Sequence, residues 1–260
     1  MRTFRTLLTI TTVAATTWSA TAAQHAPETA PQPPLSLELN VPAFRIDVLR
    51  DTTRIRSFDV AVGTRQYPTP RGEFEISEII WNPWWTPPPS EWAREDTITP
   101  PGRGNPMGRV KMQLAPSYLI HGTPLEQSIG SAGSHGCVRM RNADVVALAR
   151  LLQEESGVPF SDSVVAVLLQ RRTTRNVTLP SPLPVRIVYR TTEVRADTLL
   201  LHPDVYRLHA SRVDEAMASL EAAGLDSAAF DRERLVELLN SARDSTVHVP
   251  LDRVMPRADP

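Results

Sequence analysis

Residues 120–140 read IHGTPLEQSIGSAGSHGCVRM, and this stretch contains the only cysteine in the chain. Cys137 stands among small and polar residues, with His135 two positions before it and His121 sixteen positions before it. A cysteine attacks as the thiolate, and a free thiol has a pKa of about 8.5, so reactivity near neutral pH requires a neighbouring base or cation. The pattern leaves three interpretations open: a nucleophile, a metal ligand, or an inert buried thiol.

The metal-ligand interpretation is the weakest of the three. Zinc takes four tetrahedral ligands, usually arranged in pairs about two to four residues apart. His121, His135 and Cys137 supply only three ligands, and two of them form a cramped His-x-Cys pair. We therefore predict that the protein binds no metal and uses no cofactor. The inert interpretation is less favoured because the residues that precede the thiol, 131–136 (SAGSHG), are small or polar.

The nucleophile interpretation requires a base, and His121 is the candidate, because a strand end followed by a returning loop can bring it back to Cys137. Gly136 removes side-chain bulk at the point where a substrate carbonyl must approach. The backbone N–H groups around Gly136 and Cys137 are candidates for an oxyanion site. A helix predicted from Ala143 would place its N-terminus nearby and favour a negative charge on the sulfur.

Apolar residues alternate upstream of this stretch, over residues 35–62 and again over residues 73–80. Period two predicts half-buried strands, and we expect further short strands at residues 110–114 and 118–120. Residues 81–92 (WNPWWTPPPSEW) break this period, so they predict a rigid loop. Its indoles either pack on the adjacent sheet or line a substrate cleft.

Downstream, apolar spacing near 3.6 predicts a helix over residues 143–155, capped by Asn142 and ended by Gly157. The run at 164–169 is apolar and reads as a final strand. After Arg171 we expect a hairpin between residues 185–189 and 199–201, helices over 210–223 and 231–242, and an edge strand at 247–251. Asp226 or Ser227 is the expected cap of the second of these helices.

The N-terminal residues indicate export. Residues 1–22 combine two early arginines, an uncharged apolar or small-residue stretch and an Ala-Thr-Ala site, which predicts a cleaved signal peptide. Residues 23–36 are polar and proline-rich and read as a linker. No other long apolar run exists, so we expect no membrane span in the mature protein. The net charge of −1, with both signs interspersed, offers no basic patch for nucleic acid.

The residues around Cys137 carry a family resemblance. Residues 134–140 (SHGCVRM), preceded by 120–123 (IHGT) and 128–130 (SIG), closely resemble the L,D-transpeptidase catalytic (YkuD-type) domain. Upstream segments agree as well, including Thr69-Pro70-x-Gly72-x-Phe74, Asn82-Pro83-x-Trp85-x-Pro87, Pro101-Gly102 and Asn105-Pro106-Met107-Gly108. The resemblance covers roughly residues 37–169 and is strongest to the branch found in Gram-negative cell envelopes.

This resemblance implies a fold and a domain order. The fold class is mainly β (α+β): a β-sandwich-like catalytic domain with one capping helix at residues 37–170. A C-terminal hairpin and helical extension then occupies residues 171–260. The role of residues 208–260 is not implied by any resemblance.

The resemblance also implies roles at the site. Cys137 is the acylated nucleophile, His121 is the base, and the carbonyl of Gly122 orients the imidazole. The expected oxyanion and substrate-binding residues are Ser134, His135, Gly136 and Arg139. Arg139 makes either a substrate carboxylate contact or a structural salt bridge. The expected cleft wall is formed by Trp84, Trp85 and Tyr118.

The implied reaction is acyl transfer from a peptidoglycan tetrapeptide stem through a Cys137 thioester. The product is a 3→3 cross-link or an attachment to another acceptor amine, including that of an envelope protein. The expected location is the periplasm, with a role in cell-wall biogenesis and cell shape, and with carbapenems as acylating inhibitors. A peptidoglycan hydrolase of the same domain, such as an L,D-carboxypeptidase, is the alternative. A catalytically inactive module that binds the cell wall is a weaker alternative.

Overall fold

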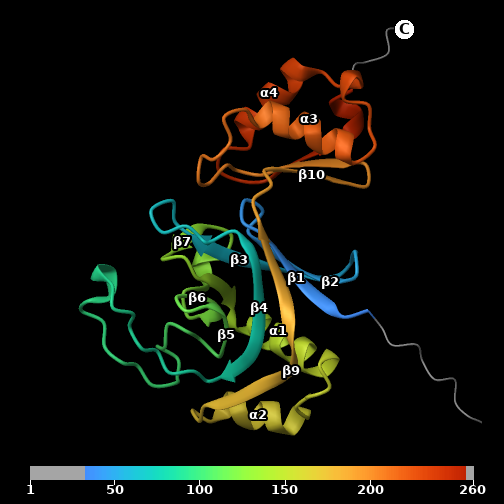
Figure 1. Cartoon of the computed structure of the whole chain (residues 1–260). Helices are drawn as coiled ribbons and strands as arrows, with labels where there is room; N and C mark the ends of the chain where they lie inside the picture. Colours follow the sequence, from blue (N-terminus) through green and yellow to red (C-terminus); the bar gives the residue numbers. More distant parts are fainter. Residues whose placement is uncertain (1–32, 256–260) are drawn as a thin grey trace, which may run out of the picture. The chain divides into compact units, whose positions relative to one another are not determined.

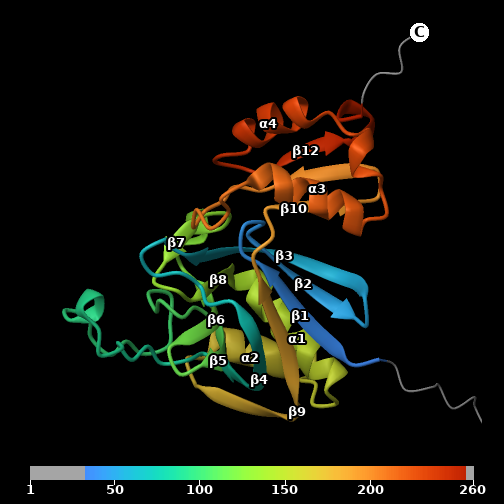
Figure 2. The ribbon, with the colours of Figure 1, turned by 45° about the horizontal axis from the view of Figure 1, so that its top comes forward.

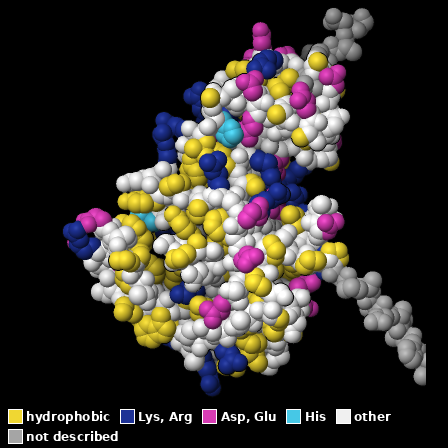
Figure 3. All heavy atoms as spheres, in the orientation of Figure 1, with side chains coloured by type: hydrophobic (Ala, Val, Ile, Leu, Met, Phe, Trp, Pro, Cys, Tyr) yellow, Lys and Arg dark blue, Asp and Glu magenta, His cyan; other side chains and the backbone are white. Residues whose placement is uncertain are grey.

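Figure 1 presents the computed structural model of the chain, which describes residues 33–255. The expected signal peptide at residues 1–22 and most of the expected linker lie outside the described residues. Among residues 33–255, no helix has both the length and the apolar character required to cross a lipid bilayer. On the face drawn in Figure 3, acidic and basic side chains lie next to one another.

A nine-stranded sheet forms the main body, with the strand order β2-β1-β9-β4-β5-β6-β8-β3-β7. An additional pairing of β2 with β3 joins two strands far apart in this order, so the sheet curls back on itself around the core. The strands are β1 (Leu35–Asn40), β2 (Arg45–Arg50), β3 (Thr53–Gly63), β4 (Gly72–Trp81), β5 (Val110–Ala115), β6 (Tyr118–Thr123), β7 (Ala132–Ser134), β8 (Val138–Arg141) and β9 (Arg175–Val188).

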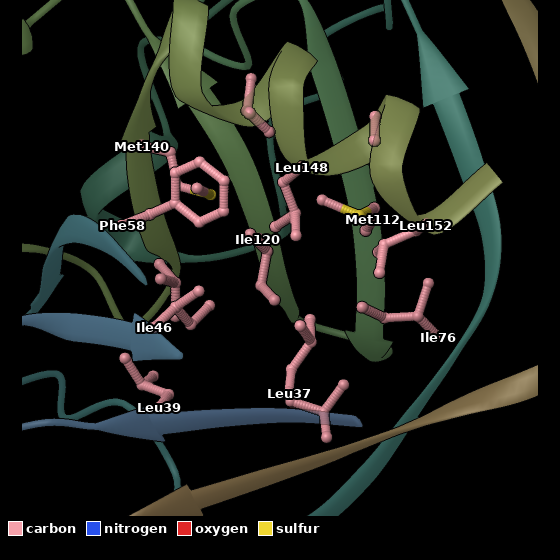
Figure 4. Close-up of a cluster of buried hydrophobic side chains, with 14 of the residues drawn as sticks. Leu37, Leu39, Ile46, Phe58, Ile76, Met112, Ile120, Met140, Leu148 and Leu152 are labelled. Carbon is pink, nitrogen blue, oxygen red and sulfur yellow. The ribbon is translucent and has the colours of Figure 1, made fainter. Parts of the chain in front are cut away.

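The core lies between this sheet and helix α1 (Asn142–Glu155). Alternate strand residues and one helix face supply its side chains, as expected for half-buried strands beside an amphipathic helix. Figure 4 shows Leu148 and Leu152 of α1 close to Met112 of β5 and Ile120 of β6. This packing, and the mainly β, α+β class, confirm the expected architecture.

The start of α1 differs from the expected cap. Arg141 holds the N-cap position and makes no side-chain cap. The Asn142 amide instead joins the end of β6 to the loop before β5: its Nδ2 donates to the Thr123 carbonyl at 2.9 Å, and its Oδ1 accepts from the Arg109 N–H at 2.8 Å. The Glu126 carboxylate accepts the Asn142 N–H at 3.1 Å and so supplies the missing cap.

Residues 164–169 form part of a helix, α2 (Asp162–Gln170), so the expected strand is wrong. The Ser161 side chain accepts the N–H of Val164 and caps this helix. Val165 and Leu168 are buried while Val167 is exposed, which is helical spacing. A short apolar run has no clear period, and the cap decides its structure.

The expected hairpin between residues 185–189 and 199–201 is also wrong. Residues 185–188 end the 14-residue strand β9, which pairs antiparallel with β4 and parallel with β1. The hairpin joins β10 (Thr192–Arg195) to β11 (Thr198–Leu201) instead. Since β9 is internal to the nine-stranded sheet, that sheet extends past the expected boundary at residue 170.

A smaller three-stranded sheet, β10-β11-β12, follows, with β12 spanning Val247–Pro250. Figure 2 shows it beside helices α3 (Arg212–Ala222) and α4 (Arg232–Ser241), with which it shares a second apolar core. The two expected helices and the edge strand are therefore confirmed, but Asp231 is the residue that caps α4. Within residues 33–255 there are also four short 3₁₀ turns, at Glu91–Ala93, Glu126–Ser128, Ser227–Ala229 and Leu251–Arg253.

Candidate active site

Strands β6 and β8 run parallel, with Ile120 opposite Val138 and His121 opposite Arg139. Ile120, Val138 and Met140 are fully buried in the core. The alternate positions of the two strands, together with the residue just before β8, border a cavity of about 550 Å³: they are Leu119, His121, Thr123, Cys137 and Arg139. The two-residue period of a strand thus brings the imidazole, the thiol and the guanidinium to one cavity.

His121 is 2% exposed, and its Nδ1 lies 2.7 Å from the carbonyl oxygen of its neighbour Gly122. A carbonyl oxygen can only accept, so Nδ1 carries the proton and the neutral ring keeps Nε2 as a proton acceptor. Burial lowers the pKa of His121 to about 4, although the Gly122 carbonyl works in the opposite direction. The imidazole is therefore uncharged at neutral pH and able to take a proton.

Cys137 is partly buried, and its Sγ lies 3.8 Å from the carbonyl oxygen of Ser117. Burial raises its pKa above the ordinary thiol value, whereas a backbone hydrogen bond with Leu119 and the charge of Arg139 lower it. The expected influence of a helix N-terminus is wrong, because the four residues of β8 separate Cys137 from α1. The resting sulfur is thus a neutral thiol that needs a base.

The loop before Cys137 is held by Ser134, which is 1% exposed. The Ser134 hydroxyl donates to the Cys137 carbonyl and accepts the Gly136 N–H at 3.1 Å. Gly136 has φ +105°, and a Cβ there would lie 2.8 Å from the ring of Tyr118, so this position requires glycine. Because the Gly136 N–H already has a partner, it is not free to bind an oxyanion.

Arg139 borders the cavity and donates to the Gly133 carbonyl at 3.0 Å. Among the described residues no acidic side chain forms an ion pair with it, so the structural salt bridge considered from the sequence does not form there. Its partly buried positive charge is therefore available to an anionic group that enters the cavity.

Aromatic rings form the outer wall of this cavity. The Trp92 indole stacks on the His135 ring, with centroids 4.1 Å apart and planes at 4°. The Tyr67 ring is tilted against the same His135 ring, with centroids 4.8 Å apart. The ring centroids of Trp85 and Trp92 are 6.4 Å apart. The β4–β5 loop is thus joined to the cysteine loop by ring contacts.

The expected site residues do not all reach the cavity. Those that border it are His121, Ser134, His135, Cys137, Arg139 and Trp85. Trp84 is 50% exposed and lies outside this lining. Tyr118 packs behind Gly136 instead of forming the wall, while Gly122 and Gly136 act through their backbones.

Sequence reasoning missed several residues that border the cavity, among them Trp92, Asp96 and Ser117. Trp92 belongs to the tryptophan-rich stretch that the sequence singled out, so the signal for it was present. Asp96 and Ser117 stand in loops without a pattern and could not be found in that way. No three His, Cys, Asp or Glu side chains within residues 33–255 gather in a way that could hold a metal ion.

Comparison with known proteins gives one consistent result. The family model for the L,D-transpeptidase catalytic domain (YkuD) matches residues 35–175. A Fuscovulum blasticum protein, named as a candidate L,D-transpeptidase of the ATP synthase subunits region, is 38% identical over 99 residues, 37% of this chain and 52% of that protein. The Escherichia coli K12 protein YbiS, also named for this activity, is 32% identical over 108 residues, 39% of this chain and 35% of that protein.

The chain thus spans about half the length, or less, of these two relatives. The solved catalytic domain of an Enterococcus faecium L,D-transpeptidase aligns with 59% of this chain and 96% of that one. Its sequence identity is 15% and its TM-score is 0.36.

Proposed function

The chain belongs to the L,D-transpeptidase catalytic domain family, and from this premise we propose that it is a secreted cysteine acyltransferase of the peptidoglycan. Its acyl donor is a tetrapeptide stem, and its covalent intermediate is a thioester on Cys137. The observation that carries the proposal is the shared cavity of His121, Cys137 and Arg139 on neighbouring strands.

In the first half-reaction, Nε2 of His121 takes the thiol proton of Cys137, and the sulfur attacks the carbonyl carbon of the third stem residue. The carbonyl oxygen becomes an oxyanion, which would lie against the part of the cavity wall that contains His135. The bond to the terminal D-alanine breaks, and its amine leaves with the proton from the imidazolium. The stem is then held as a thioester.

In the second half-reaction, an acceptor amine attacks the thioester. His121 takes a proton from this amine and returns it to the sulfur, which restores the free thiol. An amine from a neighbouring stem yields a 3→3 cross-link, and an amine from an envelope protein yields an attached protein. Water as the acceptor yields a stem shortened by one residue, which is the carboxypeptidase reaction.

Arg139 supports the choice of a peptide donor that carries carboxylates. Its guanidinium is half-buried beside the thiol and has no acidic partner among the described residues. A carboxylate of the stem would form charge-assisted hydrogen bonds with it and place the neighbouring carbonyl carbon near the sulfur.

Export completes the proposal. Residues 1–22 would be removed as a signal peptide and residues 23–36 would act as a linker, so that the enzyme works in the periplasm. The catalytic part would run from residue 37 to the end of β9, and the remaining residues would form a C-terminal extension. N-terminal sequencing of the protein recovered from periplasm tests the cleavage site.

The central experiment is acylation of the mature protein by a carbapenem, followed by intact-protein mass spectrometry. We expect one added drug mass on the wild type, none on Cys137→Ala, and a slowed reaction in His121→Gln. Either no adduct on the wild type or an undiminished adduct on Cys137→Ala would refute the nucleophile assignment. Defined tetrapeptide muropeptides, offered with and without an acceptor amine, then identify the product as cross-link, attachment or hydrolysis.

A further inference from the structure

Three backbone segments meet at Gly63, the last residue of β3. A Cβ at this position would lie 2.1 Å from the Tyr67 carbonyl oxygen, 2.6 Å from the Thr69 nitrogen and 2.9 Å from the Gly136 Cα. Such distances exclude any side chain, so only glycine allows this approach. The end of β3, the turn after it and the cysteine loop are therefore in direct backbone contact.

Thr69 joins these segments through its hydroxyl. It is 2% exposed, accepts the Gly63 N–H at 2.8 Å and donates its single proton to the Gly136 carbonyl at 2.9 Å. Gly136 directly precedes Cys137. The position of the thiol along the cavity wall thus depends on where the Thr69 hydroxyl is held.

Tyr206 holds Thr69 in turn. Its phenolic oxygen accepts the Thr69 N–H at 2.9 Å and donates to the Gly63 carbonyl at 3.0 Å. The residue is 6% exposed, and burial raises the pKa of its hydroxyl, which stays protonated and able to donate.

Tyr206 is itself anchored from outside the cavity. Its N–H donates to the Tyr189 hydroxyl at 2.7 Å, the Tyr189 hydroxyl donates to Asp204 at 2.6 Å, and the two tyrosine rings stack at 5.3 Å. These contacts supply a fixed platform for one phenol that reaches the turn beside the cysteine loop.

We propose that Tyr206 is a positioning residue for the nucleophile, acting through Thr69 and Gly136 on Cys137. Tyr206 lies beyond residues 35–175, which the family model matches, so the segment after β9 contributes directly to the geometry of the site. The inference deepens the proposed acyl-transfer function and rests on it for its role in catalysis.

A purely structural role would affect stability alone, and Thr69→Ser against Thr69→Val provides the matched control. Tyr189→Phe and Tyr206→Phe each remove one buried hydroxyl from the same stacked pair, but only Tyr206 touches Thr69 and Gly63. Thr69→Val removes the hydroxyl that reaches Gly136, and Thr69→Ser retains it. Melting temperatures are recorded for all variants, so that folding and reactivity are read separately.

The main readout is carbapenem acylation of Cys137, resolved into the rate constant at saturating drug and the concentration that gives half of it. Because small displacements of reacting atoms cost large factors in rate, we expect Tyr206→Phe and Thr69→Val to slow the saturated rate about tenfold. The half-saturating concentration should change little. Thr69→Ser should stay within about twofold of the wild type. Tyr189→Phe acts only through the Tyr206 N–H, so it should slow the saturated rate less than Tyr206→Phe does.

Iodoacetamide labelling of Cys137 in the same variants separates the two claims, because it requires no transpeptidase activity. If labelling depends on Tyr206 but the wild type takes no carbapenem, the proposed function fails and the positioning role stands. If Tyr206→Phe matches the wild type in both reactions, the positioning role fails. Should Tyr206→Phe not fold, Thr69→Val against Thr69→Ser decides: equal acylation rates in those two variants would overturn the inference.

Discussion

Gly122→Ala is the substitution whose effect is best determined by the geometry around His121. A Cβ on Gly122 would lie 2.5 Å from Oδ1 of Asn142 and 3.1 Å from both the Arg109 nitrogen and a methyl group of Val145. The Asn142 amide must move to admit it, which breaks hydrogen bonds to the Thr123 carbonyl and the Arg109 N–H.

The magnitude follows from these contacts. Overpacking costs about 1–3 kcal/mol, and each lost hydrogen bond costs about 1 kcal/mol. We therefore expect Gly122→Ala to lower the free energy of unfolding by about 3 kcal/mol and Asn142→Ala by about 2 kcal/mol. In the double variant the new Cβ occupies space that the amide has vacated, so the losses should fall short of their sum by about 2 kcal/mol.

Urea unfolding of the four proteins measures this cycle, with the slope compared between variants to verify two-state behaviour. Gly104→Ala is the control, since a Cβ there would meet no heavy atom within 4 Å; its unfolding energy should stay within about 0.5 kcal/mol of the wild type. Strict additivity in the double variant, or a loss at Gly122 no larger than at Gly104, would show that the new Cβ and the Asn142 amide do not compete for the same space. Carbapenem acylation should also slow in Gly122→Ala, because the Gly122 carbonyl orients His121.

The remaining predictions concern pH, charge and the cysteine loop. Burial lowers the pKa of His121 from 6.5 to about 4, so between these pH values the unfolded chain binds a proton that the folded chain does not. The free energy of unfolding should therefore fall by up to about 3 kcal/mol as the pH drops from 6.5 towards 4. Urea midpoints measured over this pH range should fall less steeply in His121→Gln. The acid limb of the acylation rate should lie near pH 4 for the same reason, and a limb at the ordinary histidine value would contradict it. Arg139→Gln should raise the KM for a tetrapeptide donor about tenfold or more, measured by D-alanine release. Arg139→Lys should raise this KM less, because lysine keeps the charge but loses the planar guanidinium. An unchanged KM in both variants would contradict the proposed contact between Arg139 and a stem carboxylate. Gly136→Ala combines φ +105° with a 2.8 Å approach to Tyr118 and should lose about 2–4 kcal/mol, whereas Gly224→Ala, with φ +78° and open space, should lose about 1 kcal/mol in thermal unfolding.

The sequence allowed most of the strands, helix α1 and the grouping of His121 with Cys137 to be predicted. Alternation over residues 35–62 is a local signal, and β1, β2 and β3 follow it. The short spacing of the histidine and the cysteine, with glycines between them, was sufficient to indicate a shared site.

What the sequence could not reveal depends on contacts between distant residues. Strand β9 pairs with β1 and β4, which are more than 90 positions away, and three prolines at 180–184 obscure its period. Helix α2 was decided by the Ser161 cap, and the role of Asn142 by backbone groups of Arg109 and Thr123, which lie 33 and 19 positions before it. The raised thiol pKa of Cys137 is a result of burial, which composition cannot measure.

That neutral thiol has a chemical consequence for a protein exported to an oxidising compartment, as proposed here. Peroxides and disulfides react with the thiolate, so a sulfur that keeps its proton at rest is a poor target for them. With no second cysteine in the chain to resolve a sulfenic acid, damage at Cys137 would be permanent unless another molecule repaired it. Withholding ionisation until an acyl donor is bound would thus preserve the enzyme between turnovers.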